Sequence, residues 1–375
     1  MSQLQRPTGS SSPWATVGAM ILIAVILAVA VSAMLPRPNL PEGTSAPDGT
    51  PAGTSAIADA SQTASLPAGQ TTQPSSGTSP AAPPTSGPTP GAKPTSGPQP
   101  TPGPTPRPTT GSGSLPVFRH VYVVVMENEE ASSIVGDSRA PYINSLIGKY
   151  GLATNYTAVD HPSEPNYIAL FSGSTHGITD DGKYNLAGKN VADQIEAHGR
   201  DWRVFAQNLP DAPCYTGSTS SGGPDGEGTY ARKHEPAISF TDISGNPARC
   251  AKIQNFSHFS PSAADYELIV PNLCNDMHDC GVKTGDTFLK GFLPKILTSS
   301  AMRGSVLFLT WDEGSSSTGG GGKVATVVIG DGVPAGFTSA TGYSHYSLLR
   351  TIEDSWGLGC LGSACSAGDM RAFWP

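Results

Sequence analysis

The sequence predicts an α/β fold over residues 115–375, a three-layer sandwich in which helices cover both faces of a mostly parallel central sheet. Strand and helix patterns alternate along this segment, which is typical of such folds. Residues 117–126 form a nearly continuous, Val-rich apolar run, the composition of a strand buried on both faces. The segment holds about 260 residues, enough for one large domain with a buried core.

The other elements follow in order along the domain. Pro141 opens a helical pattern over 141–150, and Gly151 stands just beyond its end, where helices commonly stop. The remaining predictions are a helix over 191–198, strands over 202–206, 305–310 and 324–329, and an amphipathic helix over 345–356.

Residues 36–114 have a different composition from the domain. They consist almost wholly of Pro, Thr, Ser, Gly and Ala, with no Phe, Trp or Tyr. Such a segment cannot bury a core, and its prolines favour extended polyproline II, so we expect a disordered linker. It would serve as a stalk for the domain or as a spacer with no required length, and the sequence leaves both open.

The segment before the linker contains an apolar run over residues 17–35, long enough to span a bilayer as a helix. It is a signal anchor that stays in the membrane, with 1–16 as the cytoplasmic N-terminus, or a signal peptide cleaved after Val31-Ser32-Ala33. Either alternative places the domain outside the cytoplasm, anchored by a single helix or secreted.

The net charge limits the partners of the domain. The chain carries −8, and its first 114 residues hold four basic and three acidic side chains, so the domain carries −8 − 1, or −9. An acidic domain without a Lys/Arg cluster argues against a nucleic-acid partner. It does not exclude a phosphate substrate, because a bound metal reverses the local field. We expect a monomer.

All six cysteines lie in the domain, and an even number in an exported chain predicts disulfides. The close spacings favour Cys274–Cys280 and Cys360–Cys365, which leaves Cys214–Cys250. Fifteen pairings are possible for six cysteines, so this pairing is a preference. A zinc site is the alternative, although the chain has no Cys-x-x-Cys pair.

Two acidic pairs directly follow predicted strands. Glu127-Asn128 comes after the first strand, and Asp312-Glu313 after the strand over 305–310. Functional groups gather at the carboxyl ends of such strands, and carboxylate and amide oxygens suit a divalent cation. Calcium, magnesium, manganese and zinc all remain open. Solvent-facing strand ends are the alternative, but two such pairs favour a metal site.

Ser163 stands at the start of a predicted helix, in the sequence His161-Pro162-Ser163-Glu164-Pro165-Asn166-Tyr167. As a preferred cap residue, Ser163 could simply be the N-cap. A helix N-terminus also offers a positive dipole end to a phosphate, and a metal beside the hydroxyl would make it a nucleophile. Asn166, one turn along, could then donate to a phosphate oxygen.

Several histidines are candidates for stabilising phosphate charge or protonating a leaving alkoxide. His278 lies beside Asp279 within the proposed Cys274–Cys280 loop. The others are His234, His161 and His345.

Five motifs in order resemble the phosphoesterase family of acid phosphatases and bacterial phospholipases C, within the alkaline phosphatase superfamily. They are Met126-Glu127-Asn128, the segment 161–167, Lys233-His234-Glu235-Pro236, the segment 275–279 and Trp311-Asp312-Glu313. The resemblance implies an alkaline-phosphatase-like fold and a phosphoserine intermediate on Ser163. It implies that Glu127, Asn128, Ser163, Asp312 and Glu313 hold a metal, and that Asn166, His234 and His278 surround the phosphate. We predict His234 and His278 as catalytic, with Asn166, His161, Asp279 and His345 binding substrate.

One departure from the family pattern concerns the residues after Glu127-Asn128. Larger members carry Arg-Ser-Phe-like residues there, whereas this chain has Glu129-Glu130-Ala131. The chain also lacks room for the extra C-terminal region of phospholipases C. Both differences favour an acid-phosphatase-like phosphomonoesterase acting on a small phosphate ester, with a phospholipase C-type phosphodiesterase as the alternative.

Three other functions fit the sequence less well. An α/β-hydrolase esterase needs Gly-x-Ser-x-Gly, and the nearest match, residues 173–177, has Thr175 in the nucleophile position. The Gly-rich run 319–323 lacks the first Gly and the final Ser or Thr of a nucleotide-binding loop, and we expect a mobile loop there. A non-enzymatic stalked surface protein is less favoured because every proposed site residue is present.

Overall fold

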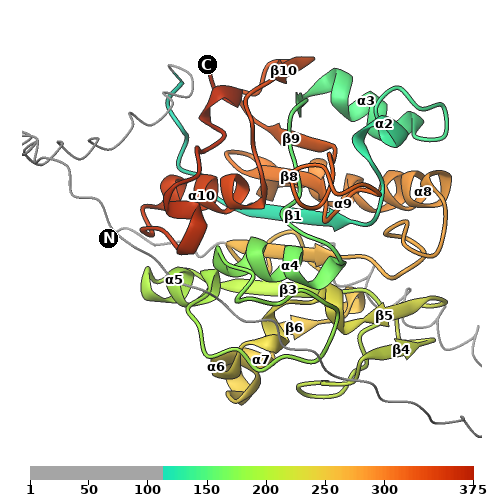
Figure 1. Ribbon diagram of the computed structural model, residues 1–375, viewed down its shortest axis with the longest axis vertical. Helices are drawn as coiled ribbons and strands as arrows, with labels where there is room; N and C mark the ends of the chain where they lie inside the picture. Colours follow the sequence, from blue (N-terminus) through green and yellow to red (C-terminus); the bar gives the residue numbers. More distant parts are fainter. Residues whose placement is uncertain (1–112) are drawn as a thin grey trace, which may run out of the picture. The chain divides into compact units, whose positions relative to one another are not determined.

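The computed structural model describes residues 113–375, and its framework is one eight-stranded sheet with the order β10-β2-β9-β8-β1-β7-β3-β6 (Figure 1). β1 lies near the middle and pairs in parallel with β8 and β7, and β3 continues the parallel run between β7 and β6. β9 is antiparallel to β8 and β2, and β10 is parallel to β2. The sheet strands are β1 (Val121–Met126), β2 (Gly151–Ala153), β3 (Trp202–Ala206), β6 (Ile253–Gln254), β7 (Tyr266–Val270), β8 (Val306–Trp311), β9 (Thr326–Gly330) and β10 (Phe337–Ser339).

The main helices form two layers, one on each face of this sheet (Figure 1). The chain crosses from β7 over β1 to β8 through α8 and α9, and in the opposite direction from β2 to β3 through α4 and α5. Right-handed crossovers in opposite directions place their helices on opposite faces. α3 packs with α8, and α10 packs with α4. Their bounds are α3 (Pro141–Lys149), α4 (Ser163–Ser172), α5 (Val191–Ala197), α8 (Val282–Phe292), α9 (Pro294–Leu297) and α10 (His345–Trp356).

The remaining elements are short. A two-stranded hairpin pairs β4 (Thr219–Ser221) with β5 (Thr229–Ala231). Short helices are α2 (Ala131–Ile134), α6 (Thr241–Ser244) and α7 (Pro247–Cys250), with 3-10 turns η1 (Arg232–His234), η2 (Ala237–Ser239), η3 (Phe256–His258), η4 (Ser300–Met302), η5 (Gly362–Cys365) and η6 (Arg371–Phe373).

The α/β architecture with a mostly parallel sheet, predicted from the sequence, is confirmed. Every side chain of β1 is buried, as its apolar composition indicated. α10 has the predicted bounds, and α3 begins at Pro141 as expected. Gly151 lies beyond the end of α3, as expected, and it also begins β2. The sequence did not predict β7, the neighbour of β1.

All six cysteines form disulfides in the structure. Cys214 pairs with Cys250, Cys274 with Cys280, and Cys360 with Cys365, the pairing preferred from their spacings. Within residues 113–375, none of the helices is long and apolar enough to cross a bilayer. The segments predicted over 1–16 and 17–35, and the linker up to residue 112, lie outside the described residues.

Glu267 is a buried carboxyl group on the central strand β7. Its Oε1 accepts hydrogen bonds from the backbone N–H groups of Ala263 and Ala264, while Oε2 has no hydrogen-bond partner. Burial raises the pKa of Glu267 to about 8, although those hydrogen bonds and the charge of Arg203 act in the opposite direction. The folded state therefore holds a proton on this group that the unfolded chain releases at a lower pH.

Glu267→Gln should remove a pH-dependent loss of stability. As pH rises from about 4.5 to about 8, the folded state retains the proton that the unfolded state has lost, so the free energy of unfolding falls. We expect the wild type to lose on the order of a few kcal/mol relative to the variant between these limits. Urea unfolding at both pH values measures this difference. A matched control is the exposed Glu227→Gln, and an equal pH response in both variants would contradict the account.

Candidate active site

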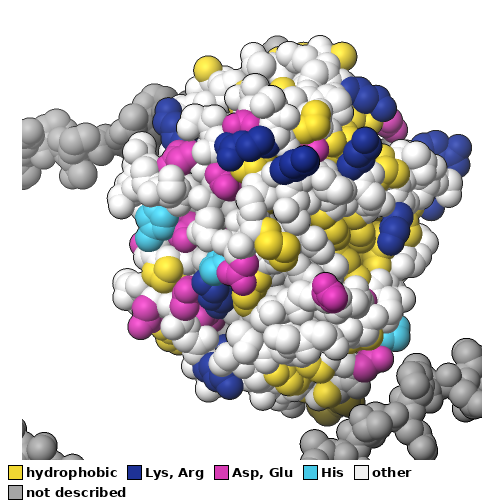
Figure 2. Space-filling view, turned by 90° about the vertical axis from the view of Figure 1, so that its right-hand side faces the viewer, with side chains coloured by type: hydrophobic (Ala, Val, Ile, Leu, Met, Phe, Trp, Pro, Cys, Tyr) yellow, Lys and Arg dark blue, Asp and Glu magenta, His cyan; other side chains and the backbone are white. Residues whose placement is uncertain are grey.

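The two predicted acidic pairs meet at the carboxyl edge of the sheet. β1 and β8 are parallel neighbours with Met126 opposite Trp311, so the residues that follow them lie side by side. The Asn128 N–H donates to Asp312 Oδ1 at 3.3 Å, and the Asp312 N–H donates to the Met126 carbonyl at 2.9 Å. This edge faces right in Figure 1, where α2 and α8 follow β1 and β7, and Figure 2 shows a His side chain among acidic and basic ones on that face.

Ser163 is the first residue of α4 and is 2% exposed. Its hydroxyl donates to Glu127 Oε2 at 3.2 Å. Pro162 occupies the N-cap position and no side chain caps the helix, so the interpretation of Ser163 as a simple cap is wrong. The helix also offers fewer free amides than expected, because the Glu164 N–H donates to Asp181 Oδ1 and Pro165 has none.

His234 and Glu127 form a buried ion pair at the centre of the site. His234 Nε2 lies 2.9 Å from Glu127 Oε1, and His234 Nδ1 lies 3.3 Å from Asp276 Oδ2. The ring also stacks on Tyr167, whose hydroxyl donates to Glu127 Oε1 at 2.7 Å. His234 therefore bridges two carboxylates from different strand ends, which holds both in place.

The pKa values of this pair move apart. Burial alone would raise the pKa of Glu127, but the charge of His234, hydrogen bonds from His234 and Tyr167, and the charge of Lys233 lower it to about 2. Burial would lower the pKa of His234, but Glu127 and Asp276 raise it to about 9. At neutral pH the pair is therefore imidazolium and carboxylate, and Glu127 is a poor base but a strong hydrogen-bond acceptor.

The loop closed by Cys274–Cys280 brings a second histidine to the site. His278 Nδ1 lies 2.7 Å from Asp279 Oδ1, and its Nε2 lies 3.2 Å from Lys233 Nζ. Because a lysine ammonium only donates, His278 Nε2 accepts and the ring proton resides on Nδ1, facing Asp279. The Lys233 ammonium also pairs with Asp181 Oδ2 at 2.9 Å.

Glu313 lies beside His161 and Asn166. His161 Nδ1 is 2.8 Å from Glu313 Oε2, and its Nε2 is 2.7 Å from the Ser316 carbonyl. The Asn166 amide oxygen accepts from the N–H groups of Val159 and Asp160, and its nitrogen donates to backbone carbonyls and, at 3.4 Å, to Glu313. Asn166 thus holds the segment before Ser163, and its predicted contact with phosphate remains a prediction.

His345 lies behind the acidic pairs, at the start of α10, and is 1% exposed. Its Nε2 is 2.5 Å from the Asp312 carbonyl, and its Nδ1 is 3.1 Å from the Tyr156 hydroxyl. Burial lowers the pKa of His345 to about 4, so the ring is neutral. In this position it supports the backbone of Asp312, and the predicted substrate contact remains a prediction.

Three residues without a predicted role belong to the cluster in the structure, namely Tyr167, Lys233 and Asp276. Each stood inside a quoted motif, directly beside or near a residue that did receive a role. Asp276 is fully buried, its Oδ1 accepts from the His278 N–H, and its carbonyl accepts from the Glu127 N–H. The signal was therefore present, but only the fold shows which side chains point inward.

The donor set fits a divalent cation. Among the described residues, Asp312 Oδ2 is a buried oxygen without a hydrogen-bond partner. Burial and the charges of Glu127 and Glu313 raise the pKa of Asp312 well above its usual value, as expected for acids crowded together. The oxygen-rich set Glu127, Asn128, Ser163, Asp312 and Glu313 suits a hard cation. Ligand atoms of Glu127, His234 and His278 also lie within 4.8 Å of one another, although His234 as an imidazolium has no free lone pair for a cation.

The glycine run 319–322 packs closely against the segment before Ser163, and its predicted mobility remains a prediction. A Cβ on Gly320 would lie 2.2 Å from the Val159 carbonyl oxygen, and one on Gly321 would lie 2.3 Å from that of Asp160. Glu130 accepts hydrogen bonds from the N–H groups of Ser316 and Lys323 at the two ends of the run. Only glycine permits this close approach to the segment that leads into Ser163.

A model of the phosphoesterase family matches residues 136–359, more than half of the chain. The chain belongs to the phosphoesterase family. The match includes Ser163, His234, His278 and Asp312, whereas Glu127 lies just before it. As a family member the chain is a hydrolase of phosphoric esters.

Relatives with similar sequences are named as phosphatases. A phosphatidylinositol-3-phosphatase of Mycobacterium tuberculosis is 34% identical over 269 residues, covering 70% of this chain and 85% of that protein. A probable acid phosphatase of Kluyveromyces lactis and an acid phosphatase of Aspergillus fumigatus are each 30% identical over 257 residues, 65% of this chain. The chain spans 60% and 56% of these two fungal proteins.

Solved structures with similar architecture are more distant in sequence. A protein in the alkaline phosphatase superfamily from Vibrio parahaemolyticus superposes with a TM-score of 0.46 at 12% identity, covering 72% of this chain and 74% of that one. A lipoteichoic acid synthase from Listeria monocytogenes gives 0.49 at 10% identity, covering 70% and 77%.

Gly321→Ala should disturb the site from outside the proposed catalytic set. The added methyl must displace the Asp160 backbone, so we expect a loss of about 1–3 kcal/mol in the free energy of unfolding and a lower kcat/KM. Gly148→Ala is the matched control, because Gly148 lies in helix α3 with no atom within 4 Å of the place where its Cβ would stand. That variant should be neutral or slightly stabilising. Equal stability and activity in both variants would contradict the packing argument.

Proposed function

We propose that this chain is an exported, metal-dependent phosphomonoesterase of the acid-phosphatase type that acts through a phosphoserine intermediate on Ser163. One observation carries the proposal: a buried serine hydroxyl at a helix start donates to Glu127, within a cluster of carboxylates from two adjacent strand ends. The relatives named as acid phosphatases and as a phosphatidylinositol-3-phosphatase support a monoester substrate.

Several residues of the chain would orient the ester and its nucleophile. Glu127 holds the Ser163 hydroxyl, and Tyr167 and His234 fix Glu127 in turn. The positive end of α4 and the Lys233 ammonium would meet charge on the phosphoryl oxygens. A divalent cation held by Glu127, Asn128, Ser163, Asp312 and Glu313 would, when bound, lower the pKa of the Ser163 hydroxyl and offset negative charge.

The reaction would proceed in two displacements. Ser163 Oγ gives up its proton and attacks phosphorus, the new O–P bond forms as the ester O–P bond breaks, and the leaving oxygen takes up one proton in exchange. Water then attacks phosphorus, the Ser163 Oγ–P bond breaks to release phosphate, and one proton of that water returns to Ser163 Oγ. His278 lies at the edge of the cluster with Asp279 holding its Nδ1 proton, a position suited to proton transfer at Nε2 once Lys233 engages the phosphate.

Two features support the proposal that the domain is exported. The apolar run over 17–35 suits a membrane anchor or a signal peptide, and the domain contains three disulfides, which persist in oxidising compartments. We propose that the domain acts outside the cytoplasm.

Ser163→Ala should abolish hydrolysis of p-nitrophenyl phosphate while leaving the fold intact. Without the attacking oxygen no covalent intermediate can form, so we expect kcat/KM to fall by at least about 10³-fold. Ser172→Ala is the matched control, because Ser172 is a buried serine on the same helix whose hydroxyl donates to the Ile168 carbonyl. Retained turnover in the Ser163 variant would exclude it as the nucleophile.

Removal of divalent cations should lower both activity and thermal stability. The crowded carboxylates repel one another, so a cation that binds the folded state raises its melting temperature. We expect dialysis against a chelator to abolish turnover and lower Tm, and single additions of calcium, magnesium, manganese or zinc to identify the ion that restores both. An unchanged Tm and full activity in excess chelator would contradict the metal assignment.

A further inference from the structure

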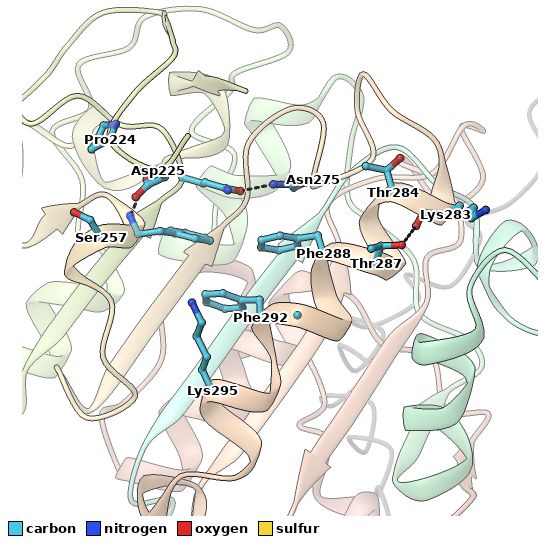
Figure 3. A pocket seen from close by; sticks show the side chains of 13 residues that line it. Pro224, Asp225, Ser257, Asn275, Lys283, Thr284, Thr287, Phe288, Phe292 and Lys295 are labelled. Carbon is cyan, nitrogen blue, oxygen red and sulfur yellow. Dashed lines mark hydrogen bonds between the residues drawn. The ribbon is translucent and has the colours of Figure 1, made fainter. Parts of the chain in front are cut away.

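A groove of about 820 Å³ runs along α8 beside η3 (Figure 3). Its wall is built from the rings of Phe256, Phe288 and Phe292, with centroids 5.0 Å apart between Phe256 and Phe292 and 5.4 Å apart between Phe288 and Phe292. The rings stack at interplanar angles of 25° and 14°, so they form one apolar cluster on the wall of the groove. A concave site of this size with an aromatic wall is typical of small-molecule binding.

One end of the groove lies beside the loop closed by Cys274–Cys280. Asn275 and Gln207 line the groove at this end, and the Asn275 side-chain amide donates to Gln207 Oε1 at 2.9 Å. Asn275 directly precedes Asp276 within the loop closed by Cys274–Cys280, and Gln207 directly follows β3. The groove therefore starts at the same edge of the sheet as the proposed phosphate site and continues along α8.

The rim of the groove is basic although the domain is acidic. Lys283 and Lys295 both line it, and Lys295 Nζ lies 5.5 Å from the centroid of the Phe292 ring. Figure 3 shows their side chains at different ends of the helical stretch that carries Phe288 and Phe292. The one acid in the lining, Asp225, accepts hydrogen bonds from the N–H groups of Asn208 and Phe256. The apolar wall suits a hydrocarbon chain, and the lysines at its rim favour the approach of a molecule with an anionic head group.

Gly291 keeps the groove open. It lies in α8 directly before Phe292 and three residues after Phe288, and it lines the groove. No atom lies within 4 Å of the place where its Cβ would stand. A glycine inside a helix weakens that helix, and here no close approach of backbone requires it. The space that a larger side chain would take is therefore available to a ligand.

We propose that this groove binds the hydrocarbon chain of the phosphate ester that the site cleaves. The substrate would then be an anionic amphiphile, with its phosphate at Ser163 and its chain passing Asn275 to lie against Phe288 and Phe292. This inference rests on the proposed phosphatase activity and names the substrate class for it.

The test is a series of n-alkyl phosphates, from ethyl to decyl, each kept below its micellar concentration. We expect KM to be level for the shortest chains, which do not reach the groove. It should then fall by up to about fourfold for each further CH₂, and by at least about tenfold between butyl and decyl phosphate, because each CH₂ leaves water. A KM that does not fall with chain length would overturn the proposal.

Gly291→Trp should fill the groove and flatten this chain-length dependence, while kcat and KM for ethyl phosphate stay at wild-type values. Gly148→Trp is the matched control, since Gly148 is an exposed glycine in helix α3 with equally open space and no place in the groove. It should keep the full dependence. Phe288→Ser, at a partly exposed position, gives a second variant that should raise KM for decyl phosphate and leave KM for ethyl phosphate unchanged.

The outcomes separate this inference from the proposed function. If the wild type cleaves no member of the series, the phosphatase proposal fails. If it cleaves ethyl and decyl phosphate with equal KM, the phosphatase proposal stands and the hydrocarbon groove is wrong. A chain-length dependence that survives in Gly291→Trp would place the hydrocarbon site elsewhere and also overturn the assignment.

Discussion

The buried pair of Glu127 and His234 is the interaction on which the site depends. Glu127 follows the central strand β1 and is fully buried. Its negative charge must therefore be neutralised by groups inside the protein. His234 meets that charge and also contacts Asp276, which links the end of β1 to η1 and to the loop after β7. A buried pair contributes little net stability, but losing one partner leaves a costly uncompensated charge. The pair therefore fixes geometry more than it stabilises the fold.

Contacts around this pair hold the segment before Ser163 and the backbone of Asp312 in place. The glycine run packs on the segment before Ser163, Asn166 hydrogen-bonds the same segment, and His345 supports Asp312 from behind. The disulfide loop presents His278 to Lys233. These contacts come from several elements, so the position of the Ser163 hydroxyl is set by the whole carboxyl edge of the sheet rather than by α4 alone.

The sequence predicted those parts of the fold that local pattern determines. The Val-rich run of β1 and the amphipathic α10 were clear, because period and composition decide them. β7 was missed, since its short run carries the polar Glu267 and only pairing between β1 and β3 makes it a strand. Likewise, the motifs indicated Glu127, Asp312 and Ser163. The roles of Tyr167 and Lys233, and a groove joining Gln207 to Lys295, depend on tertiary contacts that spacing does not show.

The central claim is that the phosphoryl group is transferred to Ser163 as a covalent intermediate. Rapid acid quenching of the wild-type domain during turnover of p-nitrophenyl phosphate, followed by peptide mass spectrometry, tests it most directly. The account predicts one added phosphoryl group on the peptide that contains Ser163, localised to that residue. Phosphate found on His234 or His278 instead, or no phosphorylated peptide while turnover is rapid and a burst of p-nitrophenol is measured, would contradict it.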